Sequence, residues 1–446
     1  MRSTGRHSLQ LSSLASVFLG LTLVAVPATP AHAQSVRAQQ WHLDAMRASE
    51  MWKISTGQGI TVAVIDSGVD DSLADLKGQV LDGKDFSEQR GDEHTDVAGH
   101  GTDMAALIAG TGKRGPQYGS YGLAPGSKIL PIRMRYASDQ FGQVDSRKEF
   151  SRALTAAIRY AADSKAQIIN MSLGNDDSPG RQDVGTPELA SAVKYALSKG
   201  KLLFAAVGNN GEKANRPEYP ASTPGVVGIA AADKNAKVGR FSQWGPEVDM
   251  MAPGIDMVHA CLGGSEICKS RGTSDATAIA SASAALIWSK HPDWTNNQVL
   301  RVMLNTLNKP ADGSKRSDLI GYGGIRPRAA LLNPGDPGPA DVYPLPDLAA
   351  AAAKSPSPES PKPTAPAKHE EAAPKSADGG GSTLLWTGVG VAAALVVGAA
   401  AAFAVFRSRR RTGTTPPPPP AYPPYVPAQS PHQPPADSHH RSEKNP

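Results

Sequence analysis

The chain has 446 residues, a formal net charge of +5 and only two cysteines. The positive charge is confined to the ends, because residues 1–33 carry +2 and residues 407–446 carry +4, which leaves −1 for the rest of the chain. Basic residues that flank apolar segments serve membrane topology, so this distribution excludes a nucleic-acid-binding protein. Composition marks residues 34–333 as the globular part, a length that suits one large α/β domain.

The first 33 residues predict a secretory signal peptide. Two arginines precede an apolar run at residues 14–26, and the small residues Ala31-His32-Ala33 follow it. These three parts in this order are typical of a signal that is cleaved before Gln34. The alternative interpretation is a buried core helix.

The globular part alternates short apolar runs with helical segments. The runs predict buried strands at residues 60–65, 129–132, 168–173, 202–207 and 226–230. Helical spacing or composition predicts helices at residues 150–162, 187–198 and 274–289. This alternation predicts an α/β fold, a doubly wound and mostly parallel sheet with helices on both faces. Ligands of such sheets gather at the carboxyl ends of strands, where Asp66 and Asn209 lie.

Three short motifs carry the candidate chemistry. A predicted strand ends in Val64-Ile65-Asp66-Ser67-Gly68, and predicted helices begin at Gly99-His100-Gly101-Thr102 and at Gly272-Thr273-Ser274-Asp275. A serine hydroxyl is a poor nucleophile at neutral pH, so it requires a nearby base and a group that fixes the tautomer of that base. His100 and Asp66 can fill these roles for Ser274. A buried core histidine is the alternative for His100.

The two cysteines are predicted to form a disulfide. Cys261 and Cys268 are seven positions apart in a chain that the signal peptide sends to an oxidising compartment. Two free thiols are the alternative. Because a short loop gains little from closure, we expect the disulfide to fix the backbone just before Ser274.

The segments after the globular part predict a membrane anchor. Residues 334–383 are rich in Pro and Ala and predict a semi-rigid linker. Residues 384–406 contain no charge and are long enough to cross a bilayer as a helix. The tail, residues 407–446, begins with four arginines in five positions and then becomes rich in proline.

By the positive-inside rule this basic tail stays in the cytoplasm. The sequence therefore predicts a single-pass type I protein of the cell membrane, with its globular domain on the extracytoplasmic side. A cleavable surface-anchoring signal is the alternative, but no LPxTG motif precedes the apolar run.

The three motifs resemble those of the subtilisin-like serine proteases, the peptidase S8 family, and the resemblance extends over roughly residues 41–330. It implies a subtilisin-like fold and a protein or peptide substrate. It also implies that Asp66 orients the base, that His100 is the base and that Ser274 is the nucleophile.

Two further segments resemble binding motifs of this family. Residues 206–211 match the oxyanion-hole motif, with Asn209 at the position of the donor, although a plain turn residue is the alternative. The segment Ser172-Leu173-Gly174 resembles the strand that pairs with an extended substrate. Such pairing gives affinity through backbone hydrogen bonds, so side-chain pockets must supply the specificity.

Within this family the order of segments resembles that of the mycosins, which are associated with type VII secretion. The shared features are a signal peptide, a catalytic domain, a Pro-rich stalk, one membrane helix and a short basic tail. The resemblance implies an extracytoplasmic serine endopeptidase that works through an acyl-enzyme beside a secretion complex. The alternative is a catalytically weak or silent structural clamp, which has no need of the full set of site residues.

No metal or cofactor is expected for this chemistry. His94, Asp96 and His100 lie close together in the sequence, but their spacing fits no zinc motif. Calcium sites are common in the wider family, yet no loop of this sequence can be assigned to one.

Two positions depart from the family pattern. Asp275 stands where an apolar residue usually follows the nucleophile, and Ala278 stands where proline is usual. A carboxylate favours the first turn of a helix but opposes a negative charge that develops beside it. We expect Asp275 to turn away from the oxyanion and to be held by Arg271 or a backbone amide. The change at Ala278 is expected to cost only a little rigidity.

Overall fold

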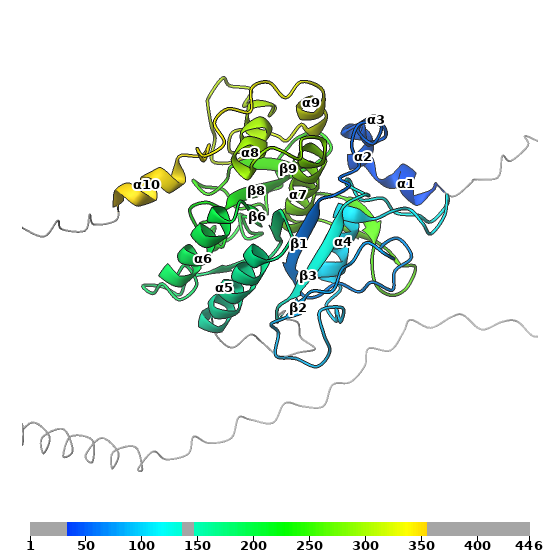
Figure 1. Ribbon diagram of the computed structural model, residues 1–446, viewed down its shortest axis with the longest axis horizontal. Coiled ribbons are helices and arrows are strands. Elements are labelled where there is room, and N and C mark those ends of the chain that lie inside the picture. Colours follow the sequence, from blue (N-terminus) through cyan, green and yellow to red (C-terminus); the bar gives the residue numbers. More distant parts are fainter. Residues whose placement is uncertain (1–33, 136–146, 355–446) are drawn as a thin grey trace, which may run out of the picture. The chain divides into compact units, whose positions relative to one another are not determined.

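The computed structural model describes residues 34–135 and 147–354 (Figure 1). The chain divides into two units, Met1–Pro358 and Glu359–Pro446, and all described residues belong to the first unit. The predicted signal peptide, membrane helix and tail lie outside the described residues. Within the described part, no helix combines the length and the apolar character that crossing a membrane requires.

Seven of the described strands form one parallel sheet in the order β2-β3-β1-β4-β6-β8-β9. Their bounds are β1 (Thr61–Asp66), β2 (Lys84–Asp85), β3 (Lys128–Arg133), β4 (Ile168–Met171), β6 (Leu202–Ala206), β8 (Val227–Ala232) and β9 (Met250–Pro253). Two antiparallel pairs lie outside this sheet: β5 (Asn175–Asp176) with β7 (Glu218–Tyr219), and β10 (Met257–Ala260) with β11 (Ile267–Ser270). The five strands expected from apolar runs correspond to β1, β3, β4, β6 and β8, which confirms the predicted parallel sheet.

Helices of the described part cover both faces of the sheet. Their bounds are α1 (Val36–Gln39), α2 (Trp41–Ala45), α3 (Ala48–Met51), α4 (His100–Ala109), α5 (Arg147–Asp163), α6 (Pro187–Ser198), α7 (Thr273–Lys290), α8 (Asn296–Asn305), α9 (Pro327–Leu332) and α10 (Asp347–Lys354). The three predicted helices correspond to α5, α6 and α7. Helices α4 and α7 lie on one face of the sheet, and α5 and α6 lie on the other. Figure 1 shows α5 and α6 side by side.

Each face of the sheet has its own apolar core, because successive strand residues point to opposite sides. In β1, Val62 and Val64 pack with residues of α4 and α7, whereas Ala63 and Ile65 pack with residues of α5 and α6. Helix α7 is buried from Thr273 to Trp288 and contacts five strands. Its many alanines and serines permit this close approach, so the helix that carries Ser274 is held in the interior of the domain.

The strand order reverses beside β1, which has β3 on one side and β4 on the other. Such a reversal opens a crevice at the carboxyl ends of the strands, where α/β proteins bind their ligands. Asp66 is the last residue of β1, Ser172 directly follows β4, and Asn209 comes three residues after the end of β6. The predicted site residues from these three strands therefore share one edge of the sheet.

The domain extends beyond the predicted boundary at residue 333. Leu345 is buried in the core, and the Arg301 guanidinium donates to the carbonyls of Pro337 and Pro339 at 2.6 and 2.9 Å. The first part of the predicted linker, residues 334–345, thus packs on the domain. Its Pro-rich composition conceals this packing, because only a few apolar side chains anchor it.

Candidate active site

A buried carboxylate orients the candidate base. Asp66 has no exposed surface, and its Oδ1 lies 2.8 Å from Nδ1 of His100. A carboxylate oxygen only accepts, so His100 donates from Nδ1 and keeps Nε2 as the basic nitrogen. Burial alone would lower the pKa of His100, but the charge and the hydrogen bond of Asp66 outweigh it and raise this pKa to about 9.

Asp96 fixes the start of α4, the helix that carries His100. Its carboxylate accepts from the backbone N–H groups of Gly99 and Thr102, each at 2.8 Å, and from the Thr102 hydroxyl at 2.6 Å. These bonds cap N–H groups that have no partner within the helix. The position of Asp96 just ahead of a predicted helix is a capping signal, and this role replaces that of a metal ligand.

The two glycines beside His100 let α4 approach β1. A Cβ on Gly101 would lie 2.0 Å from the carbonyl oxygen of Gly68 and 3.1 Å from Cβ of Asp66. Gly99 has a φ of 79°, which side-chain-bearing residues rarely adopt. Both glycines are therefore needed for the short distance between Asp66 and His100.

The candidate nucleophile is bound to the predicted substrate segment. Ser274, the second residue of α7, donates from Oγ to the carbonyl of Ser172 at 3.0 Å. In return, the Ser172 hydroxyl donates to the carbonyl of Ser274 at 2.9 Å. In this conformation the Ser274 hydroxyl proton points toward the Ser172 carbonyl, so the O–H bond must turn away from it before the proton can pass to a base.

Asn209 is bonded to the start of the same helix. Its Oδ1 accepts from the backbone N–H of Thr273 at 2.9 Å and from the Thr273 hydroxyl at 3.1 Å. This fixes the orientation of the amide, because the two N–H groups must then point the other way from Nδ2. The Ser274 N–H is among the first four of α7, which lack partners within the helix. Nδ2 of Asn209 and the Ser274 N–H are thus the candidate donors for an oxyanion.

The departure at Asp275 is accommodated by the hairpin of β10 and β11. The Ser270 hydroxyl donates to Oδ1 of Asp275, and Nε2 of His259 lies 2.9 Å from Ser270 Oγ. Arg271, one of the expected donors, instead lies over the ring of Phe241 at 5.5 Å. Asp275 is thus held by local donors as expected: the Ser270 hydroxyl and a backbone N–H hydrogen-bond its carboxylate, whereas Arg271 does not.

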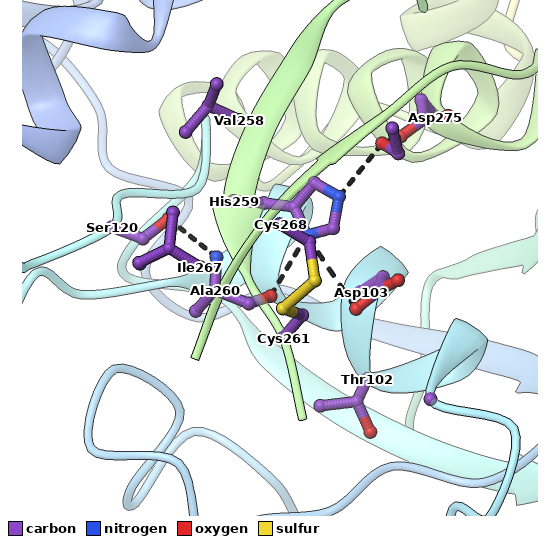
Figure 2. A network of polar contacts seen from close by, with 12 residues as sticks. Thr102, Asp103, Ser120, Val258, His259, Ala260, Cys261, Ile267, Cys268 and Asp275 are labelled. Atoms are coloured by element: carbon purple, nitrogen blue, oxygen red, sulfur yellow. Dashed lines mark hydrogen bonds and ion pairs between the residues drawn. A yellow bond between two sulfur atoms is a disulfide. The ribbon is translucent and has the colours of Figure 1, made fainter. Parts of the chain in front are cut away.

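These contacts balance the charge of Asp275. Figure 2 shows the fully buried His259 between Asp103 and Asp275; its Nδ1 lies 3.0 Å from the carbonyl of Ala260, which only accepts. Ser270 has a single hydroxyl proton and cannot donate to both His259 and Asp275. His259 and Asp275 together therefore carry one proton more than they would if the imidazole were neutral and the carboxylate ionised. Burial also raises the pKa of Asp275.

Asp275→Asn is expected to leave kcat within about threefold of the wild-type value. The asparagine amide can donate to Ser270, and the carboxylate charge that it replaces is already balanced by the network. Steady-state peptide hydrolysis by the full-length protein measures this. A rise in kcat of about tenfold or more would show that the Asp275 carboxylate opposes the negative charge of the oxyanion.

The predicted disulfide is present and closes the hairpin that holds Asp275. Cys261 and Cys268 are bonded to each other, and Cys268 pairs in register with His259 across β10 and β11. The same hairpin supplies Ser270, which contacts the residue after the candidate nucleophile. The disulfide therefore supports the backbone leading to Ser274, as expected.

The side chains considered as metal ligands have other partners. His94 Nε2 lies 3.9 Å from carboxylate oxygens of Asp82 and Glu93, while Asp96 caps α4 and His100 faces Asp66. In the described ranges, no group of three or more His, Cys, Asp or Glu side chains is arranged to hold a metal ion. That the chemistry needs no cofactor stays a prediction.

A serine, a histidine and an aspartate at one edge of a parallel sheet define the class: the chain belongs to the subtilase family, whose model matches residues 57–323. It is 35% identical to the major intracellular serine protease of Bacillus subtilis (strain 168) over 249 residues, which are 54% of this chain and 72% of that protein.

Solved structures add a more particular likeness. MycP1 from Mycobacterium smegmatis matches with a TM-score of 0.59 and 27% identity over 68% of this chain and 87% of that chain. A chain of the periplasmic assembly from the ESX-5 inner membrane complex matches with a TM-score of 0.60 and 26% identity, over 76% and 92% of the two chains. The predicted family and the likeness to mycosins are confirmed.

Proposed function

We propose that this protein is a membrane-anchored, extracytoplasmic serine endopeptidase that cleaves protein substrates through an acyl-enzyme. The observation that carries the proposal is the buried Asp66 carboxylate 2.8 Å from His100, at the same edge of the sheet as Ser274. Membership of the subtilase family supports the same chemistry.

In the proposed reaction, Ser274 Oγ attacks the substrate carbonyl while its proton passes to Nε2 of His100. Asp66 stabilises the imidazolium that forms and keeps the ring in its orientation. The oxyanion accepts from Nδ2 of Asn209 and from the Ser274 N–H. His100 then gives its proton to the leaving amine, and the same residues direct a water to the acyl-enzyme.

An extended substrate is proposed to lie beside residues 172–174. These residues belong to no strand of the described structure, since β4 ends at Met171 and β5 begins at Asn175. Their backbone groups are therefore suited to pairing with a substrate strand. The hydrogen bonds between Ser172 and Ser274 support a substrate position beside the proposed nucleophile.

The proposed link to type VII secretion rests on the structural likeness to MycP1 and to a chain of the ESX-5 periplasmic assembly. The membrane anchor rests on the apolar residues 384–406 and the arginines after them. A second candidate function is a catalytically weak or silent clamp of a secretion complex, which the likeness to a chain within an assembly favours.

Labelling of intact cells tests location and chemistry together. A membrane-impermeant fluorophosphonate should label the full-length protein but not the Ser274→Ala variant, while a C-terminal epitope should become accessible only after permeabilisation. Labelling only after permeabilisation would contradict the topology. Absence of labelling from the purified, folded protein would favour the clamp.

The pH profile should reflect the raised pKa of His100. The base must be unprotonated to accept the serine proton, so kcat/KM should fall as the pH decreases through the pKa of the free enzyme. We expect kcat/KM for an uncharged peptide to reach half of its maximum near pH 9, well above the ordinary 6.5. A half-maximum at or below pH 6.5 would contradict the influence assigned to Asp66.

A further inference from the structure

Glu218 lies where two segments of the candidate site meet. It belongs to β7, and its Oε2 is 2.7 Å from the position that a Cβ on Gly174 would occupy. Its Oε1 accepts a long hydrogen bond of 3.5 Å from Nδ2 of Asn210. Gly174 ends the predicted substrate segment, and Asn210 directly follows Asn209. The carboxylate therefore borders both the substrate segment and the oxyanion segment.

No described Arg or Lys side chain forms an ion pair with this carboxylate. The two arginines near β5 and β7, Arg147 and Arg216, instead bind the Asp176 carboxylate at 3.1 and 3.2 Å. Burial raises the pKa of Glu218 to about 7, opposed by the hydrogen bond from Asn210 and assisted by the charge of Asp176. A partly buried carboxylate with a single long hydrogen bond is poorly stabilised, and a cation would stabilise it.

The substrate can bring this cation to Glu218. The attacked carbonyl must lie beside Ser274 Oγ, with its oxygen toward Asn209. The substrate residue that carries it is then placed between the segments of residues 172–174 and 209–210, and Glu218 touches both of them. A Lys or Arg side chain can pass its apolar stem between them and bring its charged end to the carboxylate.

We propose that Glu218 is a specificity-determining residue, which makes the enzyme prefer substrates with Arg or Lys immediately before the scissile bond. The inference rests on the proposed endopeptidase function and adds the class of substrate to it. An acidic side chain at that substrate position would meet a like charge and be rejected.

The test is the ratio of kcat/KM for two peptides that differ only in the residue before the cleaved bond, Arg in one and Leu in the other. At pH 8.5 the full-length wild-type protein should favour Arg, and Glu218→Gln should lower the Arg to Leu ratio by about tenfold or more. The matched control is Glu212→Gln, which removes an exposed carboxylate that pairs with Arg240 and should leave the ratio unchanged.

A pH series on the wild-type protein gives a second readout, because the ratio cancels the titration of His100. The ratio should rise between pH 6 and pH 8 as Glu218 ionises, because the neighbouring Asp176, despite its partial burial, has its pKa lowered by Arg147 and Arg216 and does not titrate in this range.

A wild-type ratio of one or less would overturn the inference even if the Glu218 variant does not fold, and an unchanged ratio in a folded variant would do the same. In both cases cleavage of the Leu peptide leaves the proposed function standing. Hydrolysis of neither peptide would contradict the proposed function, and the inference with it.

Discussion

Ser274→Ala should lower kcat for peptide hydrolysis on the order of 10⁶-fold, the loss that removal of the nucleophile causes in subtilisin. Without the hydroxyl no acyl-enzyme forms, and only the oxyanion donors and substrate binding remain to assist water. The substitution also removes the bond from Oγ to the Ser172 carbonyl, but the return bond from the Ser172 hydroxyl to the Ser274 backbone is retained.

Ser198→Ala is the matched control for this variant. Ser198 is an exposed residue at the end of α6, where its hydroxyl donates only to the Tyr195 carbonyl of its own helix. Its kcat should equal that of the wild-type protein. If Ser274→Ala kept more than about a thousandth of the wild-type activity, a different residue would have to be the nucleophile.

Asp66→Asn should lower kcat by about 10⁴-fold, the loss seen when the corresponding carboxylate of a serine protease becomes an amide. An amide oxygen accepts hydrogen bonds from Nδ1 of His100 and from the Ser67 N–H less strongly than a carboxylate does. If the amide N–H instead donates to Nδ1, His100 carries its proton on Nε2 and can no longer accept the proton of Ser274. The similar size of the two side chains keeps the fold intact, which the melting temperature checks.

The exposed Asp71, five residues further along the chain, provides the control substitution Asp71→Asn, which should not change kcat. A loss of less than about tenfold in Asp66→Asn would mean that His100 does not depend on this carboxylate. Asp66 would then not account for the raised pKa of His100, and the half-maximum of kcat/KM expected near pH 9 would also be wrong.

The sequence predicted the fold and the main site because both depend on local patterns. Apolar runs become parallel strands, and residues at strand ends and helix starts must meet at one edge of such a sheet. Asp66 and His100 are 34 positions apart in the chain, yet one ends β1 and the other begins α4. Their pairing therefore follows from the topology.

The supporting contacts could not be predicted in the same way. The mutual hydrogen bonds of Ser172 and Ser274 join residues 102 positions apart, and the Ser270 contact with Asp275 depends on β11, a strand without a strong apolar pattern. Glu218 is in a two-residue strand that no periodicity reveals. These contacts arise from tertiary packing, which brings together polar side chains that no local sequence pattern connects.

The most direct test of the central claim is the mass of the purified full-length protein after reaction with a fluorophosphonate. We expect one adduct per chain, located on Ser274 by peptide mapping and absent from Ser274→Ala. An adduct on another residue, or none on a protein that melts cooperatively, would contradict a serine endopeptidase built on Asp66, His100 and Ser274.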